Sequence, residues 1–416
     1  MSRAWRSVIR VGLLLAAIVG ASWIGAEAQA QAPIKIGLLA PLTGPFAANG
    51  RDLVAGTELY LDEIGRQAAG RKIELVVEDD QANPAIALTK ARKLVEQDRV
   101  HILTGGVLAS VGYALHPYVE AARIPTTYPV MAPDDLTQRT RSTWVVRTGF
   151  SASQPLHPFG EWVAKNLGYK RIVTVGMDYA FGWEVVGGFQ RTFEENGGQI
   201  IQKIWTPLPT VDFAPFLAQI RRDADAVFAL MAGRPALQFV KQYQDSGLKA
   251  RLPLIGAGTV TDEVVLSAMG DEALGIVTAN FYSNALDTPA NRKFAAAFEQ
   301  KTGRIASHGA ELSYTNARWI AEAVKASGGK VEDRDALLAA LRKVEIKDAP
   351  RGPLAVDAYG NPIQNIYVRR VERVGGKRQN TVIHTFPAVS QFWKYSPEEY
   401  LKLPLYTRDY PPCKHC

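Results

Sequence analysis

Cysteine is almost absent from this chain, which has two cysteines among 416 residues. Both stand at the C-terminus, in the run Cys413-Lys414-His415-Cys416. The body of the fold therefore has no disulfide framework. In an oxidising compartment the two thiols suit a local bridge, with two free thiols as the alternative. A metal site here would need two further ligands, and a haem-attachment motif would need a histidine after Cys416.

Runs of like charge are missing as well. The formal net charge is +7, and it falls to +5 without residues 1–32, which carry Arg3, Arg6, Arg10 and Glu27. This is a mild excess on so long a chain, and no block of lysine and arginine concentrates it. The sequence therefore predicts no nucleic-acid partner.

Motifs of catalysis are also lacking. The six histidines show no metal-ligand spacing, and no GxSxG or Walker-type loop occurs. The run Gly256-Ala257-Gly258 lacks the third glycine and the downstream acid of a dinucleotide site. An enzyme would need a catalytic constellation, and none is visible. The sequence predicts a protein that is not an enzyme and that holds no metal or cofactor.

A long apolar stretch stands at the N-terminus. Arginines in the first ten residues precede the apolar run from Val11 to Ile24, and three overlapping small-x-small sites follow between Ala26 and Ala32. This layout is typical of a cleaved secretory signal peptide, which we place at residues 1–32. An uncleaved anchor is the alternative, although the run is short for a bilayer. No cysteine ends the signal, so we expect no lipid anchor and a soluble, exported, periplasmic protein.

From Pro33 onward, short β-branched runs alternate with amphipathic helical patterns. The first series of predicted strands covers residues 34–39, 72–77, 100–103 and 124–128. The second series begins near residue 155, with strands at 171–176, 200–205, 226–230 and 253–256. Two consecutive strand–helix series predict an α/β protein with two doubly wound parallel sheets and right-handed crossovers.

The remaining chain breaks this alternation. Three helices in succession are predicted at 289–302, 310–326 and 334–342, followed by a hairpin. These helices have no further sheet to cover, so we expect the chain to cross back to the first lobe and then return. The predicted segments are lobe 1 (33–149 plus 282–346), lobe 2 (150–281 plus 347–391) and a surface tail (392–416). The predicted hinge strands lie near 148–153, 279–284 and 344–352.

Open parallel sheets bind ligands at the carboxyl ends of their strands. The candidate ligand-binding residues there are Phe46, Ala109, Ser110, Val130, Met131, Ala132, Tyr179, Phe181, Arg234, Gly258 and Thr259. Ser110 stands where a helix begins, so its hydroxyl and the first free N–H groups suit a carboxylate. Plainer roles stay open: a simple helix cap for Ser110, helix packing for Tyr179 and Phe181, and a surface position for Arg234.

Several motifs carry a family resemblance through their order along the chain. They are Ile34-Lys35-Ile36-Gly37, Pro41-Leu42-Thr43-Gly44-Pro45, Glu78-Asp79-Asp80, Ile124-Pro125, Arg147-Thr148, Tyr179-Ala180-Phe181-Gly182 and Gly352-Pro353-Leu354. Together they resemble the periplasmic substrate-binding proteins of branched-chain amino acid ABC transporters, the leucine/isoleucine/valine-binding protein family. The resemblance covers nearly all of the chain after residue 32. It implies a type I periplasmic-binding (Venus-flytrap) fold, a monomer that closes over a small molecule, and delivery to ABC transporter permease subunits.

The resemblance also carries over binding positions. The family's hydroxyl before the third helix matches Ala109, with Ser110 adjacent. Its backbone carbonyl and threonine hydroxyl on the next segment match Val130 and Ala132. The aromatic residue of its second lobe matches Phe181.

A departure from the family concerns the ligand. The acidic residue that pairs with an α-ammonium matches Gly258, which has no side chain. Moving an ammonium ion out of water without a charged or multiply accepting partner costs several kcal/mol. We therefore expect an apolar or aromatic carboxylate, with Phe46, Tyr179 and Phe181 as walls and Ser110, backbone N–H groups and Arg234 as carboxylate partners. A branched-chain amino acid ligand and a sensory module for a membrane receptor stay open as alternatives.

Overall fold

The computed structural model describes residues 32–416 of the chain. The predicted signal peptide lies outside this part, apart from its last residue. Among the described residues, none of the helices combines the length and the apolarity that a membrane span needs.

The first sheet has six strands in the order β2-β3-β1-β4-β5-β6. These are β2 (Gln67–Ala68), β3 (Arg71–Asp79), β1 (Ile34–Ala40), β4 (Ile102–Gly105), β5 (Thr126–Tyr128) and β6 (Val145–Arg147). β1, β3, β4, β5 and β6 pair in parallel, and the short β2 runs antiparallel to β3. Nearly every residue of β1 is buried, as in a parallel strand covered on both faces.

Helices follow the first strands as expected. They are α2 (Ala47–Glu63), α3 (Pro84–Arg92, continued by a π-turn at Lys93–Gln97) and α4 (Ala109–Ala122). Asn83 is the N-cap of α3, because its side chain accepts from the N–H groups of Ala85 and Ile86. α2 begins at Ala47 rather than at residue 52. At Gly50 an added Cβ would lie 2.0 Å from the Pro41 carbonyl oxygen. Glycine therefore allows the first turn of α2 to lie directly against the Pro41 backbone.

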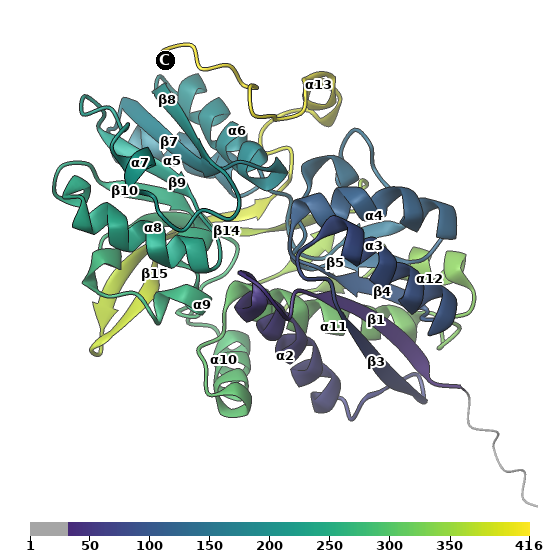
Figure 1. Ribbon diagram of the computed structural model, residues 1–416. Coiled ribbons are helices and arrows are strands. Elements are labelled where there is room, and N and C mark those ends of the chain that lie inside the picture. Colours follow the sequence, from purple (N-terminus) through teal and green to yellow (C-terminus); the bar gives the residue numbers. More distant parts are fainter. Residues whose placement is uncertain (1–31) are drawn as a thin grey trace, which may run out of the picture. The chain divides into compact units, whose positions relative to one another are not determined.

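The second sheet has nine strands, ordered β12-β13-β14-β11-β10-β9-β7-β8 with β15 beside β14. Its parallel part consists of β7 (Arg171–Met177), β8 (Gln199–Thr206), β9 (Ala226–Leu230), β10 (Leu254–Ala257) and β11 (Val277–Asn280). Its helices are α5 (Leu156–Asn166), α6 (Ala180–Glu195), α7 (Ala214–Leu217), α8 (Arg234–Asp245) and α9 (Glu263–Leu266). The predicted α/β fold with two wound parallel sheets is confirmed (Figure 1).

An antiparallel extension of the second sheet goes beyond the prediction. It consists of β12 (Glu345–Ile346), β13 (Leu354–Val356), β14 (Pro362–Val374) and β15 (Lys377–Val389). β14 pairs antiparallel with β11, β13 and β15. Gly375 and Gly376, at φ +56° and +79°, turn β14 into β15.

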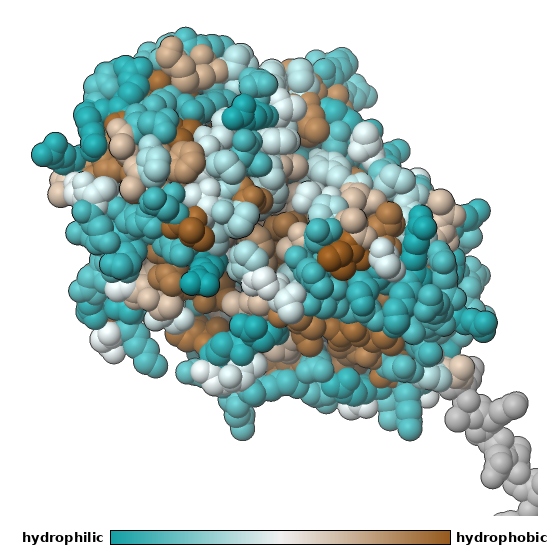
Figure 2. Space-filling model, viewed as in Figure 1, coloured by the Kyte–Doolittle hydropathy of each residue, from teal (hydrophilic) through white to brown (hydrophobic). Residues whose placement is uncertain are grey.

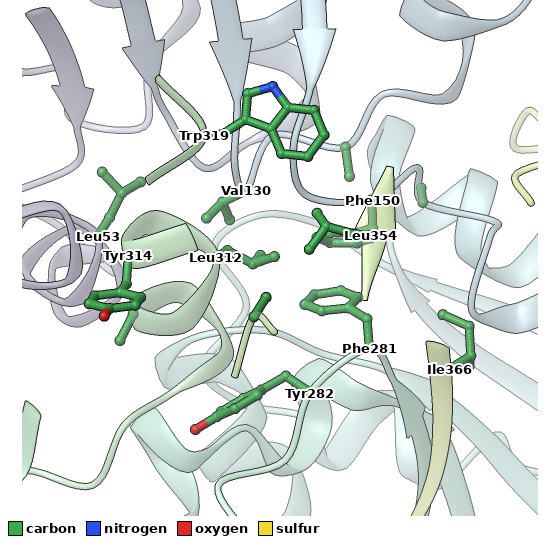
Figure 3. Close-up of a cluster of buried hydrophobic side chains, with 14 of the residues drawn as sticks. Leu53, Val130, Phe150, Phe281, Tyr282, Leu312, Tyr314, Trp319, Leu354 and Ile366 are labelled. Carbon is green, nitrogen blue, oxygen red and sulfur yellow. The ribbon is translucent and has the colours of Figure 1, made fainter. Parts of the chain in front are cut away.

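The three helices after the second sheet pack against the first one. They are α10 (Pro289–Thr302), α11 (His308–Ala326) and α12 (Arg334–Leu341). α11 approaches α2 so closely that a Cβ on Gly56 would lie 2.1 Å from the Ala310 carbonyl oxygen. The crossing of the chain back to the first sheet is therefore present. Figure 3 shows Leu53 of α2 and Trp319 of α11 in the same buried cluster as Phe281 and Ile366.

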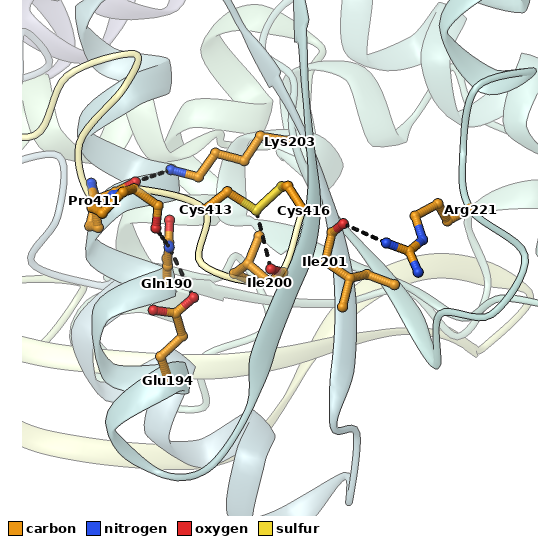
Figure 4. Close-up of a disulfide and its surroundings, with 10 residues drawn as sticks. Gln190, Glu194, Ile200, Ile201, Lys203, Arg221, Pro411, Cys413 and Cys416 are labelled. Atoms are coloured by element: carbon orange, nitrogen blue, oxygen red, sulfur yellow. Dashed lines mark hydrogen bonds between the residues drawn. A yellow bond between two sulfur atoms is a disulfide. The ribbon is translucent and has the colours of Figure 1, made fainter.

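The C-terminal tail lies along α5 and α6, and it contains the short helix α13 (Pro397–Lys402). Tyr406 packs on α6 and its hydroxyl lies 3.0 Å from His157 Nε2. Cys413 and Cys416 form a disulfide, as one of the two alternatives predicted, and Cys413 Sγ lies 3.2 Å from the Ile200 carbonyl (Figure 4). The tail is thus attached to the second sheet along its length.

A buried ion pair joins two of the segments expected at the hinge, 148–153 and 344–352, to α11 and β14. Arg351 Nη1 lies 2.8 Å from Glu311 Oε2, and the two side chains are 1% and 0% exposed. Arg351 also donates to Gln364 Oε1 and to the Thr148 carbonyl. Gln364 in turn donates to the Gly149 carbonyl at 2.7 Å. Every charged atom of the pair has a partner, so the pair fixes how these segments cross.

Replacing Arg351 with Met is expected to lower the free energy of unfolding by about 3–5 kcal/mol, because Glu311 keeps a buried charge without a partner. Urea unfolding followed by circular dichroism measures the change. Arg318→Met is the matched control, since Arg318 pairs with Asp348, whose side chain is 72% exposed, and its loss costs at most about 1 kcal/mol. Equal losses for the two variants would contradict the role given to Arg351.

Candidate ligand-binding site

A cavity lies where the carboxyl ends of strands from both sheets meet. It surrounds about 460 Å³ of empty space, part of it open to solvent. Its wall consists of Phe46, Asn49, Val107, Leu108, Val130, Phe150, Tyr179, Phe181, Ala232, Gly233, Thr259, Asp262 and His308. In the space-filling view, apolar residues gather toward the hollow at the centre of this face, and hydrophilic residues cover most of the rest (Figure 2). The position, at the carboxyl ends of parallel strands, suits a small-molecule site.

The structure brings some of the candidate residues together in this wall, namely Phe46, Val130, Tyr179, Phe181 and Thr259. The others lie outside it. Ala109, Met131 and Ala132 are buried behind the surface, Gly258 is buried in the turn before Thr259, and Ser110 is half-buried in the first turn of α4. Arg234 is exposed at the first residue of α8. The prediction for these positions awaits a ligand-bound structure.

Aromatic rings form much of the apolar wall. The Phe150 and Phe181 rings meet edge to face at 6.2 Å, and Phe281 stands behind Phe150 at 4.4 Å. Tyr179 lies beside Phe181 with ring centroids 6.2 Å apart. The ring cluster offers flat apolar faces and ring edges to a ligand.

Gly233 lies directly against the Phe46 ring in the cavity wall. It holds φ +62°, and a Cβ there would lie 3.1 Å from the Phe46 ring. A side chain at this position would push the ring aside, so glycine keeps Phe46 in the wall.

An Asp–His pair is the charged part of the wall. His308, the first residue of α11, places Nδ1 3.2 Å from Asp262 Oδ2, and the two side chains are 5% and 2% exposed. Burial disfavours both charges, but the attraction and the hydrogen bond between the groups prevail. They raise the pKa of the His308 imidazole above its ordinary value and lower the pKa of the Asp262 carboxyl. The contact therefore favours the charged forms of both groups, the imidazolium and the carboxylate.

The orientation of the imidazolium follows from this contact. Asp262 occupies Nδ1, and within residues 32–416 no hydrogen bond to Nε2 is formed. The His308 backbone N–H donates to Asp262 Oδ1 at 3.3 Å, which ties the start of α11 to the same carboxylate. Nε2 is thus the ring N–H left to donate to a ligand in the cavity.

Arg369 of β14 holds the neighbouring turn in place. Its guanidinium donates to the Tyr282 carbonyl at 2.7 Å and to the Gly258 carbonyl at 2.9 Å. This fixes the Gly258–Thr261 turn, which carries Thr259 into the wall. Glu263 lies 3.7 Å from Arg369; burial raises the pKa of the Glu263 carboxyl, although Arg369 opposes this rise. A cation therefore supports the turn from behind the cavity.

Several wall residues escaped the sequence analysis. Val107, Leu108, Ala232 and Gly233 belong to the strand-end segments from which the candidates were drawn, so a signal for them existed. Phe150 belongs to a segment assigned to the hinge. Asn49, Asp262 and His308 carried no signal, because α2, α9 and α11 come together only in the folded chain. Within the described residues, no group of His, Cys, Asp and Glu side chains is placed to hold a metal ion.

The fold and the cavity together define a binding protein that holds a small molecule between two α/β sheets. A family model described as "Periplasmic binding protein" matches residues 33–378, and the chain belongs to this family. It is an extracytoplasmic solute-binding protein of the ABC-transporter type.

Relatives and solved structures agree with this class. The chain is 32% identical over 375 residues to Leu/Ile/Val-binding protein homolog 6 of Brucella suis biovar 1 (strain 1330), covering 87% of this chain and 94% of the relative. It is similar to a solute-binding protein of Rhodopseudomonas palustris BisB5 in complex with 3,4-dihydroxybenzoic acid, at 35% identity and TM-score 0.82, covering 86% and 98% of the two chains. A further R. palustris solute-binding protein, in complex with benzoate, is 32% identical with TM-score 0.81, covering 86% and 98%.

The Asp262–His308 pair makes a prediction for titration. In the wild-type protein the imidazole of His308 should titrate above 6.5, its ordinary pKa. In Asp262→Asn the raising charge is gone while burial remains, so the pKa should fall below that value. NMR of the imidazole protons measures both. Asp348→Asn, which removes an exposed carboxylate, is the control and should leave the titration unchanged. An equal His308 pKa in the wild type and in Asp262→Asn would show that the two groups do not form the ion pair.

Proposed function

We propose that this protein captures a small aromatic carboxylate in the cavity and delivers it to an ABC importer. The observation that carries the proposal is the Asp262–His308 pair in the wall of a cavity lined by aromatic rings, where within residues 32–416 His308 Nε2 has no hydrogen-bond partner. A carboxylate that leaves water needs a charged donor, and charge-assisted hydrogen bonds are about twice as strong as neutral ones. The rings supply the apolar surface that a benzoate-like ligand buries.

Charge balance favours a carboxylate ligand without an ammonium group over an α-amino acid. Asp262 is already neutralised by His308 at 3.2 Å. An α-ammonium would therefore have to share or displace that partner, and Gly258 offers no side chain to receive it. Branched-chain amino acid binding remains the second candidate, because Asp262 is an acidic group in the wall and Leu/Ile/Val-binding homologues are among the relatives.

Helix α4 adds a second source of donors. Leu108 lines the cavity directly before the first residue of α4, Ala109. The first N–H groups of a helix have no partner within the helix and carry partial positive charge. In the proposed complex they face the carboxylate together with the Thr259 hydroxyl.

The transport mechanism we propose is closure of two lobes about a hinge. The lobes are residues 33–149 plus 282–346 and residues 150–281 plus 347–391, with 392–416 as the tail. Wall residues come from both, so a ligand gains all its contacts only in the closed form and shifts the population toward it. The Tyr113 hydroxyl donates to Glu184 Oε1 at 2.6 Å, which links α4 to α6. We assign this contact to the closed form.

The remaining parts of the proposal concern the setting of the protein. Cleavage after residue 32 releases it to the periplasm, where it works as a monomer and passes the ligand unchanged to permease subunits. It performs no catalysis. The ligand-bound structures of similar proteins support the ligand class, since benzoate and hydroxybenzoates occupy those proteins.

A ligand panel tests the proposal. We expect benzoate-type or phenylpropanoid acids to raise the melting temperature of the purified protein, and leucine and valine to leave it unchanged. At a ligand concentration 100 times Kd the stabilisation is about 2.7 kcal/mol. Isothermal titration calorimetry then gives the affinities. Stabilisation by leucine and by no aromatic acid would overturn the proposed ligand class and leave the transport role standing.

His308→Gln should weaken binding of the acid about 10- to 100-fold, as expected for loss of a hydrogen bond to a charged group. Because the pKa of His308 is raised, the imidazolium persists below that pKa and is lost as the pH rises through it. The wild-type affinity should therefore fall at alkaline pH, and the variant's affinity should not. Arg234→Ala, in an exposed residue outside the wall, is the control and should bind normally. Weak binding by Arg234→Ala with normal binding by His308→Gln would move the carboxylate to Arg234.

A further inference from the structure

Asn49 lines the cavity, and its side-chain oxygen has no hydrogen-bond partner within residues 32–416. Its Oδ1 is shielded from solvent, and no group in residues 32–416 donates a hydrogen bond to it. Leaving a buried acceptor unpaired costs about 1–3 kcal/mol. Native structures keep few such atoms, and a wall atom of a ligand cavity has an evident partner in the ligand.

The surroundings of Asn49 explain why no protein group satisfies it. Asn49 lies in the first turn of α2, and this helix has no side-chain cap that reaches back to it. The nearest acidic group along α2 is Asp52, and Asp52 is itself engaged. It accepts from Arg304 Nη2 at 2.6 Å and from the Ser307 hydroxyl at 2.6 Å. These two donors are therefore engaged by Asp52, and Asn49 Oδ1 is left unpaired on a residue that lines the cavity.

A carboxylate cannot satisfy this atom. A carbonyl oxygen only accepts, and carboxylate oxygens have no proton to give. The Oδ1 atom therefore needs a donor on the ligand, at a point other than its acid group. A hydroxyl on the aromatic ring is a donor of this kind.

Thr259, in the turn after β10, is a second wall residue with a polar atom that has no hydrogen-bond partner. Its Oγ1 is also buried without a partner. A threonine hydroxyl can donate as well as accept, so it suits the carboxylate or the ring oxygen equally. The third wall residue with such an atom is Asp262, whose Oδ2 lies 3.2 Å from His308 Nδ1 in the ion pair. Of the uncharged wall residues, Asn49 is the one whose buried atom can only accept, so it distinguishes ring-hydroxylated acids from plain ones.

We infer that Asn49 determines specificity within the proposed ligand class: it accepts a hydrogen bond from a ring hydroxyl, and the protein prefers hydroxylated aromatic acids to benzoate. The inference rests on the proposed function. The solved relatives do not decide it, since one is in complex with benzoate and others with hydroxybenzoates. What decides it is the unpaired acceptor in this chain's own wall.

The test compares affinities for benzoate, 3-hydroxybenzoate, 4-hydroxybenzoate and 3,4-dihydroxybenzoate by isothermal titration calorimetry. In the wild type, the best hydroxylated acid should bind about tenfold or more tightly than benzoate, as one hydrogen bond allows. In Asn49→Leu this preference should fall to about one, with benzoate bound at least as well as before. In Asn49→Asp, which keeps an acceptor at the same place, all affinities fall through charge repulsion but the preference remains.

Val107→Ala is the matched control, because Val107 lines the same cavity without a polar side chain. It should lower all four affinities alike. Circular dichroism and melting curves verify that each variant is folded. Equal binding of benzoate and hydroxybenzoates by the wild type, or an undiminished preference in Asn49→Leu, would overturn the role of Asn49 alone. Failure of every aromatic acid to bind would overturn the proposed ligand class, and this inference with it.

Discussion

The arrangement of the segments between the two sheets depends on one buried contact, the ion pair of Arg351 and Glu311. The pair is 1% and 0% exposed, and burial of two charges is tolerated only when every polar atom has a partner. The partners come from distant segments: the Thr148 carbonyl, the Gln364 amide and the Thr315 hydroxyl. The strands that cross between the sheets are therefore held in one geometry, and this geometry sets where the strand ends face each other.

A second buried pair, Asp262 and His308, differs from the first in one respect. Every charged atom of Arg351 and Glu311 has a partner, whereas His308 has one ring nitrogen engaged by Asp262 and the other without a hydrogen-bond partner in residues 32–416. The same kind of interaction therefore performs two tasks. The Arg351–Glu311 pair, in which every charged atom has a partner, stabilises the fold. The Asp262–His308 pair keeps one ring nitrogen unpaired, and in the proposed function this nitrogen binds the ligand.

The cavity combines this charge with aromatic faces and two idle polar atoms, Asn49 Oδ1 and Thr259 Oγ1. Each of these groups is costly while it is unpaired, and each finds its partner in the proposed ligand. The binding free energy of a solute is thus available to favour the state in which both sheets contact it. In the proposed mechanism, ligand recognition and lobe closure therefore have a common physical origin.

The tail gives the second sheet a covering that the sequence suggested only in outline. Arg191 of α6 stacks on Tyr395 at 4.0 Å and on Tyr400 at 5.2 Å. Arg139, between β5 and β6 of the first sheet, donates to the Leu403 carbonyl at 2.8 Å. The tail therefore contacts elements of both sheets. It lies outside the region matched by the family model, which ends at residue 378.

The sequence by itself indicated the parallel strands, most of the helices and the crossing of the chain back to the first sheet, and it offered the C-terminal disulfide as one of two alternatives. These follow from local patterns: β-branched runs, helical periodicity, the Asn83 cap and the spacing of two cysteines. It also found Phe46, Val130, Tyr179, Phe181 and Thr259, because strand ends can be read from strand positions.

Only the tertiary structure decided which polar groups share the cavity. His308 and Asp262 stand 46 residues apart in the sequence, and Asn49 stands much further from both. No local pattern connects three such residues, because their proximity arises from the packing of α11 on α2 and from the turn that Arg369 fixes. The apolar walls of the cavity could thus be predicted from strand positions, whereas its charged and hydrogen-bonding groups are brought together by long-range packing.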